Sequence, residues 1–260
     1  MAANWDDLAP RVVSAIGMLA VGAFAIWQGG LVFTALLAVV CGLMIWELVR
    51  MLQPDASAAA VQLGGLGAGA VLLAAFLPPV FSLPVLVAPA IVGLSFVTQN
   101  RGLYAVYTPL ILLSGLGAIT LRLDYGVTWT LWLVAVVIVT DVAGYFAGRI
   151  IGGPKFWPRV SPKKTWSGTI AGWLGAALVA VAFMANTGAG ASLIWISMIL
   201  SFASQMGDAA ESAIKRKTGV KDSSNLIPGH GGLLDRFDAM LGALLLFLLA
   251  EMAGFYPGLQ

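Results

Sequence analysis

Residues 127–140 read VTWTLWLVAVVIVT, fourteen residues without a charged side chain, and Asp141 follows them directly. A helix that spans a bilayer needs about 20 mostly apolar residues. This run therefore predicts a transmembrane helix over residues 128–149. Comparable runs occur along the whole chain and predict about nine spans, near residues 12–28, 31–51, 58–78, 80–98, 103–121, 128–149, 168–187, 190–214 and 233–253.

The composition of the chain agrees with this interpretation. Of its 260 residues, 60% are hydrophobic and 10% are charged, and the mean hydropathy is +0.93. A soluble domain has about 25% charged residues, so an ordinary soluble enzyme, a disordered protein and a nucleic-acid-binding module are excluded. The single Cys41 and the single His230 exclude a disulfide scaffold, a thiolate zinc site and a multi-histidine metal centre. We predict an all-α, polytopic membrane bundle with no nucleic-acid partner.

The basic residues predict how the bundle is oriented. With the N-terminus in the cytoplasm, 13 of the 14 Lys and Arg residues lie on the cytoplasmic side and only Arg122 lies outside. This orientation places residues 254–260 on the opposite side. The chain begins without a transit-like presequence, which favours a bacterial cytoplasmic membrane. Small residues such as those of 64–69 predict close helix packing, and they permit a homodimer without requiring one.

Most ionisable groups follow residue 140. We therefore expect one membrane domain, with residues 1–126 as helical support and residues 127–260 as the catalytic helices and loops. Asp141 precedes Arg149 by eight residues and Asp208 precedes Lys215 by seven. At about 1.5 Å per residue, both carboxylates lie roughly 10–12 Å below the cytoplasmic ends of their helices. An ionised carboxylate in hydrocarbon is costly, so the pair predicts a polar cavity that opens to the cytoplasm.

Residues 208–238 combine five acidic and five basic residues. Asp208 and Glu211 share one helix face at a spacing of three, and so do Asp235 and Asp238. Carboxylate oxygens suit Mg²⁺, which also takes substrate phosphates and water. Flanking Lys and Arg suit phosphate oxygens. The combination is what phosphoryl or nucleotidyl transfer requires.

The same region resembles the signature of the phosphatidate cytidylyltransferase family. The matching residues are SAIKR at 212–216, KD at 221–222 and IPGHGGLLDRFD at 227–238. Three upstream stretches also match: DVAGYFAGR at 141–149, SPKKTW at 161–166 and Gly207-Asp208. The N-terminal half resembles the family only in its hydrophobic pattern and in Trp46-Glu47. Two positions depart from the pattern, because Ser167 stands where the family has Glu and Gly144 where Ala is more usual.

The resemblance implies that CTP and phosphatidate give CDP-diacylglycerol and pyrophosphate with Mg²⁺, and that Asp208 and Asp235 bind the metal. A second metal or a monovalent cation stays open. We expect the lipid to enter sideways from the bilayer. We assign the remaining candidate residues by charge and position. Contacts to phosphates are expected from Lys215, Arg216, Lys221, His230 and Arg236, positioning of these cations or of a second metal from Asp222 and Asp238, and substrate binding from Asp141, Ser161, Lys163, Lys164 and Ser212.

Four other classes of protein fit these residues less well. A secondary transporter predicts a midplane site and internal repeats, but the charges crowd toward one face. A membrane prenyltransferase uses paired aspartates but has no basic, His-containing stretch between them. A CDP-alcohol phosphotransferase needs an Asp-Gly-x-x-Ala-Arg opening, which this chain does not contain. A CTP-dependent lipid kinase is the nearest chemical alternative.

Overall fold

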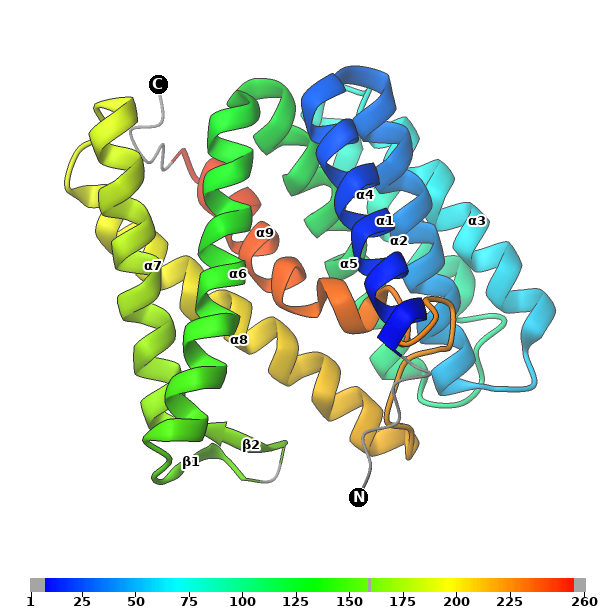
Figure 1. Cartoon of the computed structure of the whole chain (residues 1–260). Coiled ribbons are helices and arrows are strands. Elements are labelled where there is room, and N and C mark those ends of the chain that lie inside the picture. The colour runs from blue at the N-terminus through cyan, green and yellow to red at the C-terminus, as the bar shows by residue number, and fades with distance from the viewer. Residues whose placement is uncertain (1–7, 159, 255–260) are drawn as a thin grey trace. The chain divides into compact units, whose positions relative to one another are not determined.

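The computed structural model describes residues 8–158 and 160–254, and this part of the chain holds nine α-helices and one β-hairpin (Figure 1). It divides into two compact units. The first unit comprises Met1–Ile119 and Lys217–Phe237, and the second comprises Thr120–Arg216 and Asp238–Gln260. The elements are α1 (Leu8–Gln28), α2 (Gly30–Leu52), α3 (Ser57–Ala74), α4 (Pro79–Gly93), α5 (Arg101–Asp124), α6 (Gly126–Ile150), β1 (Lys155–Trp157), β2 (Ser161–Thr165), α7 (Trp166–Thr187), α8 (Ser192–Thr218) and α9 (Leu234–Met252).

Seven of these helices are long and apolar enough to cross a membrane, which fits a multi-pass membrane protein. They are α1, α2, α3, α5, α6, α7 and α8. Helix α4 has only 15 residues. Helix α9 has 19, but Asp235, Arg236, Asp238 and Glu251 give it four charges. The helical class is therefore confirmed, whereas the number of nine spans, their orientation and the functional division at residue 126 stay predictions.

Two predicted spans are shorter in the structure, and Pro78 and Pro79 lie in the connection between them. The span predicted over 58–78 ends at Ala74, and the span predicted over 80–98 runs only from Pro79 to Gly93. Proline fits the first turn of a helix because the N–H groups of that turn have no hydrogen-bond partner within the helix, so the missing N–H of proline costs nothing there. Pro79 accordingly starts α4, and the Ser82 hydroxyl donates to the Ala74 carbonyl at 3.1 Å. These residues form a tight connection between the two helices.

Within the first unit, α2 and α3 pack through glycine. A Cβ atom added to Gly64 would lie 2.7 Å from the carbonyl oxygen of Gly42, and one added to Gly42 would lie 2.7 Å from that of Gly64. Gly65, one residue further along α3, faces open space. The predicted close packing is therefore confirmed at Gly64 and is confined to one face of α3. The buried side chains of Ile45 and Leu48 complete the core beside this contact.

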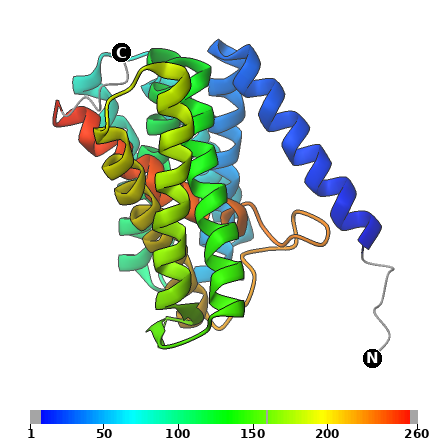
Figure 2. The same cartoon turned by 60° about the vertical axis from the view of Figure 1, so that its left-hand side comes forward.

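Within the second unit, α6 and α7 lie side by side (Figure 2), and they too meet at glycines. A Cβ atom on Gly168 would lie 2.5 Å from the carbonyl oxygen of Gly144. The chain between the two helices forms an antiparallel hairpin, with Lys155 opposite Thr165. This short hairpin was not predicted, and it adds a minor element to the helical class. Its strands have only three and five residues, too few for a hydrophobic period to be recognised in the sequence.

Candidate active site

A cavity of about 460 Å³ in the second unit brings together several predicted site residues. We call it the Asp208 cavity. Asp141 reaches it from α6, Lys163 and Lys164 from β2, and Asp208 from α8. The depth argument thus correctly placed Asp141 and Asp208 on one cavity. Its other lining residues are Thr140, Gly144, Tyr145, Gly148, Arg149, Thr165, Gly168, Thr169 and Gln205.

Asp208 is the most connected carboxylate of this cavity. One of its oxygens forms an ion pair with the Lys164 ammonium group, and the other accepts a hydrogen bond from the Ser212 hydroxyl at 3.3 Å. Lys164 also donates to the Gln205 carbonyl at 3.3 Å. Asp141 and Asp238 lie near enough to Asp208 for their negative charges to repel it. Three carboxylates therefore lie close together, and the ammonium groups of Lys164 and Lys215 lie near them.

The carboxylate oxygens of Asp208, Asp141 and Asp238 are donor atoms of the kind that Mg²⁺ prefers. Among the described residues, no group of three His, Cys, Asp or Glu side chains is arranged to hold a metal ion. Mg²⁺ is usually bound by one or two carboxylates together with water and substrate phosphates. The residues present fit a metal of this kind rather than one held in a cage of protein ligands.

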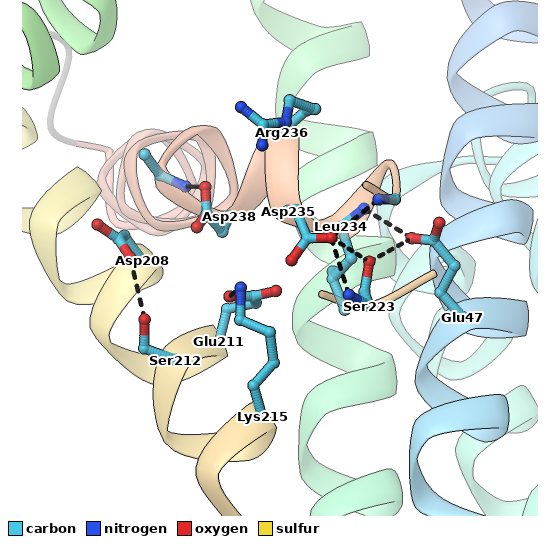
Figure 3. Close-up of polar contacts among 12 residues, drawn as sticks. Glu47, Asp208, Glu211, Ser212, Lys215, Ser223, Leu234, Asp235, Arg236 and Asp238 are labelled. Carbon is cyan, nitrogen blue, oxygen red and sulfur yellow. Dashed lines mark hydrogen bonds and ion pairs between the residues drawn. The ribbon is translucent and has the colours of Figure 1, made fainter. Parts of the chain in front are cut away.

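The other predicted residues of the second unit do not line the Asp208 cavity. Lys215 pairs with buried Glu211 at 2.5 Å on α8 (Figure 3). Arg216 is exposed and does not line the Asp208 cavity. Ser161 begins β2 opposite Trp157 and lies outside the cavity lining as well. Asp238 accepts a hydrogen bond from the Ala239 amide at 2.7 Å.

Ser167 is one of the two residues expected from the sequence to depart from the family pattern. Its hydroxyl donates to the Gly152 carbonyl at 2.5 Å and lies 2.9 Å from the Thr165 hydroxyl. Thr165 in turn caps α7 by accepting from the Gly168 amide at 3.2 Å. Ser167 therefore holds the hairpin against the start of α7.

A second cavity, of about 330 Å³, lies in the first unit. We call it the His230 cavity. Four predicted residues line it, namely Lys221, Asp222, His230 and Arg236, together with Arg11, Asn225, Ile227, Pro228, Gly229 and Gly231. The Arg236 guanidinium donates to the His230 carbonyl at 2.9 Å, and the Ser14 hydroxyl lies 2.8 Å from the His230 imidazole. Gly229 and Gly231 have φ of 73° and 83°, which non-glycine residues rarely adopt.

Asp235 belongs to the first unit and fastens the loop before α9 (Figure 3). One oxygen accepts the Ser223 amide at 2.8 Å, the Ser223 hydroxyl at 2.9 Å and the Gly232 amide at 2.8 Å. Through these contacts Asp235 connects Ser223 to Gly232 and stabilises the loop. The metal-binding role predicted for Asp208 and Asp235 stays a prediction.

Three residues were not assigned roles from the sequence, two of them in these cavities and one, Glu47, outside both linings. Gln205 donates to the Thr169 carbonyl at 3.2 Å and accepts from the Trp173 indole at 3.2 Å, which fixes one wall of the Asp208 cavity. Arg11 adds a cation to the His230 cavity. Glu47 is completely buried. A polar residue inside an apolar span was the available signal for Gln205 and Glu47, but their partners are distant in sequence.

Comparisons with a protein family and with individual proteins agree on the family to which this chain is similar. The sequence profile of the cytidylyltransferase family matches residues 9–252. A protein of Brucella suis biovar 1 named phosphatidate cytidylyltransferase is 36% identical over 256 residues, which cover 94% of this chain and 93% of that protein. Proteins of the same name from Bacillus subtilis and Haemophilus influenzae are 42% and 41% identical, over 49% and 50% of this chain and the same shares of theirs.

Proposed function

This chain belongs to the cytidylyltransferase family, and we propose that it transfers the cytidylyl group of CTP to phosphatidate. The products are CDP-diacylglycerol and pyrophosphate. One observation supports this assignment most directly: similarity to a phosphatidate cytidylyltransferase extends over 94% of the chain. The Asp208 cavity supplies matching chemistry, because carboxylates and lysines line it together.

The reaction requires one bond to form and one to break. A phosphate oxygen of phosphatidate attacks the α-phosphorus of CTP, and the bond from this phosphorus to the bridging oxygen of the β-phosphate breaks. This nucleophile is already an anion at neutral pH, so no strong general base is needed. The main barrier is the repulsion between two polyanions, which fixed positive groups lower.

The residues divide this work between them. We propose that Lys163 and Lys164 bind phosphate oxygens at the Asp208 cavity, with Asp141, Ser161 and Ser212 assisting in substrate binding. Lys215, Arg216, Lys221, His230 and Arg236 are the further candidates for phosphate contacts, and Asp222 and Asp238 are proposed to position them. In the structure Asp208 already pairs with Lys164, so the same lysine is held ready at the cavity wall.

We propose that the enzyme depends on Mg²⁺, with Asp208 and Asp235 as the ligands from the protein. When bound, the ion would neutralise the triphosphate and stabilise the leaving pyrophosphate. A second metal or a monovalent cation would use the remaining carboxylates. Chelation by EDTA is expected to abolish turnover, and added Mg²⁺ is expected to restore it. Full activity after exhaustive chelation would contradict the metal dependence.

We propose that the protein resides in a bacterial cytoplasmic membrane with its active site facing the cytoplasm. The bacterial relatives and the seven apolar helices support this location. Phosphatidate would then enter from the bilayer and CTP from the cytoplasm. Small residues on helix faces permit a homodimer, which stays a prediction.

Labelled CTP tests the reaction. The purified protein is incubated with phosphatidate and with CTP labelled at either the α- or the γ-phosphate. Lipid that gains label only from the α position is the expected result. Diacylglycerol replaces phosphatidate in a matched control and is expected to gain no label. Transfer of the γ label to lipid would instead identify a CTP-dependent kinase.

A further inference from the structure

Glu47 is a buried carboxylate with an unusual set of partners. It lies on α2 with 0% of its surface exposed, and all its polar contacts that the structure gives belong to residues 223–234 (Figure 3). Oε1 accepts the Ser224 hydroxyl at 2.6 Å and the Leu233 amide at 2.9 Å. Oε2 accepts the Leu234 amide at 2.7 Å and the Ser223 hydroxyl at 3.3 Å. We call residues 223–234 the signature loop.

These contacts require a carboxylate. Each oxygen of Glu47 faces one backbone N–H, from Leu233 or from Leu234, where α9 begins. The first N–H groups of a helix have no partner within the helix and attract negative charge. A glutamine at this position would turn its NH₂ group toward one of the two amides in either orientation, leaving two donors opposed. Glu47 therefore caps α9 in a way that an amide of the same shape cannot.

The same carboxylate is connected to Asp235 through one serine. The Ser223 hydroxyl lies 2.9 Å from Asp235 Oδ2 and 3.3 Å from Glu47 Oε2. A hydroxyl has one proton, so it donates to one of these oxygens at a time. Asp235 is the nearer, and it also accepts the Ser223 and Gly232 amides at 2.8 Å. Glu47 holds the Leu233 and Leu234 amides, which lie in sequence between Gly232 and Asp235, so it fixes the backbone between these two hydrogen-bonded residues.

The space around Gly232 shows how closely the loop approaches Glu47. A Cβ atom at this position would lie 2.3 Å from Glu47 Oε1 and 2.0 Å from the Ser223 hydroxyl oxygen. Atoms at these separations would overlap, so only glycine lets the loop reach the buried carboxylate. A side chain at position 232 would therefore displace the loop, Ser223 or the Glu47 carboxylate.

We propose that Glu47 is a positioning residue for the reaction. It fixes the signature loop and the start of α9, and by holding the Leu233 and Leu234 amides it positions the backbone that carries Asp235. The proposal rests on the proposed function in so far as it assigns the fixed loop to catalysis. The alternative is that Glu47 only stabilises the fold, in which case its loss would lower stability without a specific effect on the loop.

Hydrogen–deuterium exchange on Glu47→Gln tests the anchoring without reference to activity. The full-length protein in lipid nanodiscs is expected to exchange faster in peptides covering 223–234 and to be unchanged in α6 and α7. Thr34→Val is the matched control, since Thr34 is buried on the same helix and donates only to the Gly30 carbonyl among the contacts found. Unchanged exchange in the loop, or the same acceleration in Thr34→Val, would overturn the proposal.

Activity then tests the positioning. Loss of a group that orients a ligand typically costs 10- to 100-fold, so Glu47→Gln is expected to lower kcat/KM by about that factor. Glu47→Asp keeps two acceptor oxygens and is expected to recover part of this loss. If Glu47→Gln does not fold, Ser223→Ala and Ser224→Ala provide milder variants with the same expected signature. A loss equal to that of Thr34→Val would leave Glu47 a structural residue only.

A double-mutant cycle tests the connection through Ser223. Groups in one hydrogen-bonded network have non-additive effects, so Glu47→Gln and Ser223→Ala together are expected to cost less than the product of their separate losses in kcat/KM. Multiplying losses would contradict the connection. Wild-type protein that transfers no α label from CTP would refute the proposed function, whereas the exchange experiment would still decide whether Glu47 anchors the loop.

Discussion

Asp208 combines several interactions in one small volume. It pairs with Lys164 and accepts from Ser212, and two further carboxylates repel it. The ion pair between Lys164 and Asp208 can open when a ligand binds, because Asp208 can bind a cation and Lys164 can bind a phosphate. Asp208 and Lys164 therefore provide separate tests of the metal-binding and phosphate-binding halves of the site.

Asp208→Asn is expected to lower CTP-dependent turnover at least about 100-fold, since the neutral amide loses the charge that would bind Mg²⁺. Turnover is measured from α-labelled CTP, and membrane insertion is compared by fractionation. Asp124→Asn is the control, because this exposed aspartate at the end of α5 lies outside the Asp208 cavity. An Asp208→Asn enzyme with normal Mg²⁺-dependent activity would refute the metal assignment.

Lys164→Gln is expected to raise the KM for CTP or phosphatidate about 10-fold or more, the usual effect of losing a hydrogen bond from a charged donor. Initial rates over a range of each substrate measure the change and identify which phosphate the lysine binds. Lys155→Gln, on β1 of the same hairpin and outside the cavity lining, serves as the comparison. Equal KM values for both substrates in the two variants would exclude a phosphate contact by Lys164.

At the scale of the elements, the contact between α2 and α3 leaves no room for a methyl group. Gly64→Ala is expected to destabilise the protein by about 1–3 kcal/mol, because the added Cβ atom would overlap the Gly42 carbonyl. Gly65→Ala adds the same atom where nothing lies within 4 Å, so it is expected to be neutral or slightly stabilising. Thermal unfolding in detergent compares the two, and equal melting temperatures would contradict the packing.

Most helices could be predicted because each coincides with a long run of apolar residues. The predicted span 31–51 differs from α2 by one residue at each end. The hairpin was missed because its strands are short, and α4 was overestimated because the mostly apolar run continues past Gly93, where the helix ends. The lining of the Asp208 cavity was predicted in part from charge and depth. The contacts of Glu47 could not be predicted, because its partners are 176–187 residues away in sequence.

At the scale of the whole molecule, the distribution of Lys and Arg predicts which loops face the cytoplasm. Single cysteines in a Cys41→Ala background test it with an impermeant maleimide. Asp55→Cys is expected to react only in inside-out vesicles, and Asp124→Cys only in right-side-out vesicles, since the two loops lie on opposite sides in the predicted orientation. The reverse pattern would invert the assignment, and reaction of both in one type of vesicle would change the number of spans between them.

The contact between Glu47 and Leu234 also has a consequence for biosynthesis. A ribosome adds about 5–20 residues per second, so roughly 10 to 40 s pass between the synthesis of the carboxylate and that of the amide 187 residues later. During this interval the charge is inserted with its helix while its final donors do not yet exist. The first unit closes only when residues 217–237 leave the ribosome. Until translation is nearly complete, Glu47 must therefore be hydrated, paired with another group or protonated.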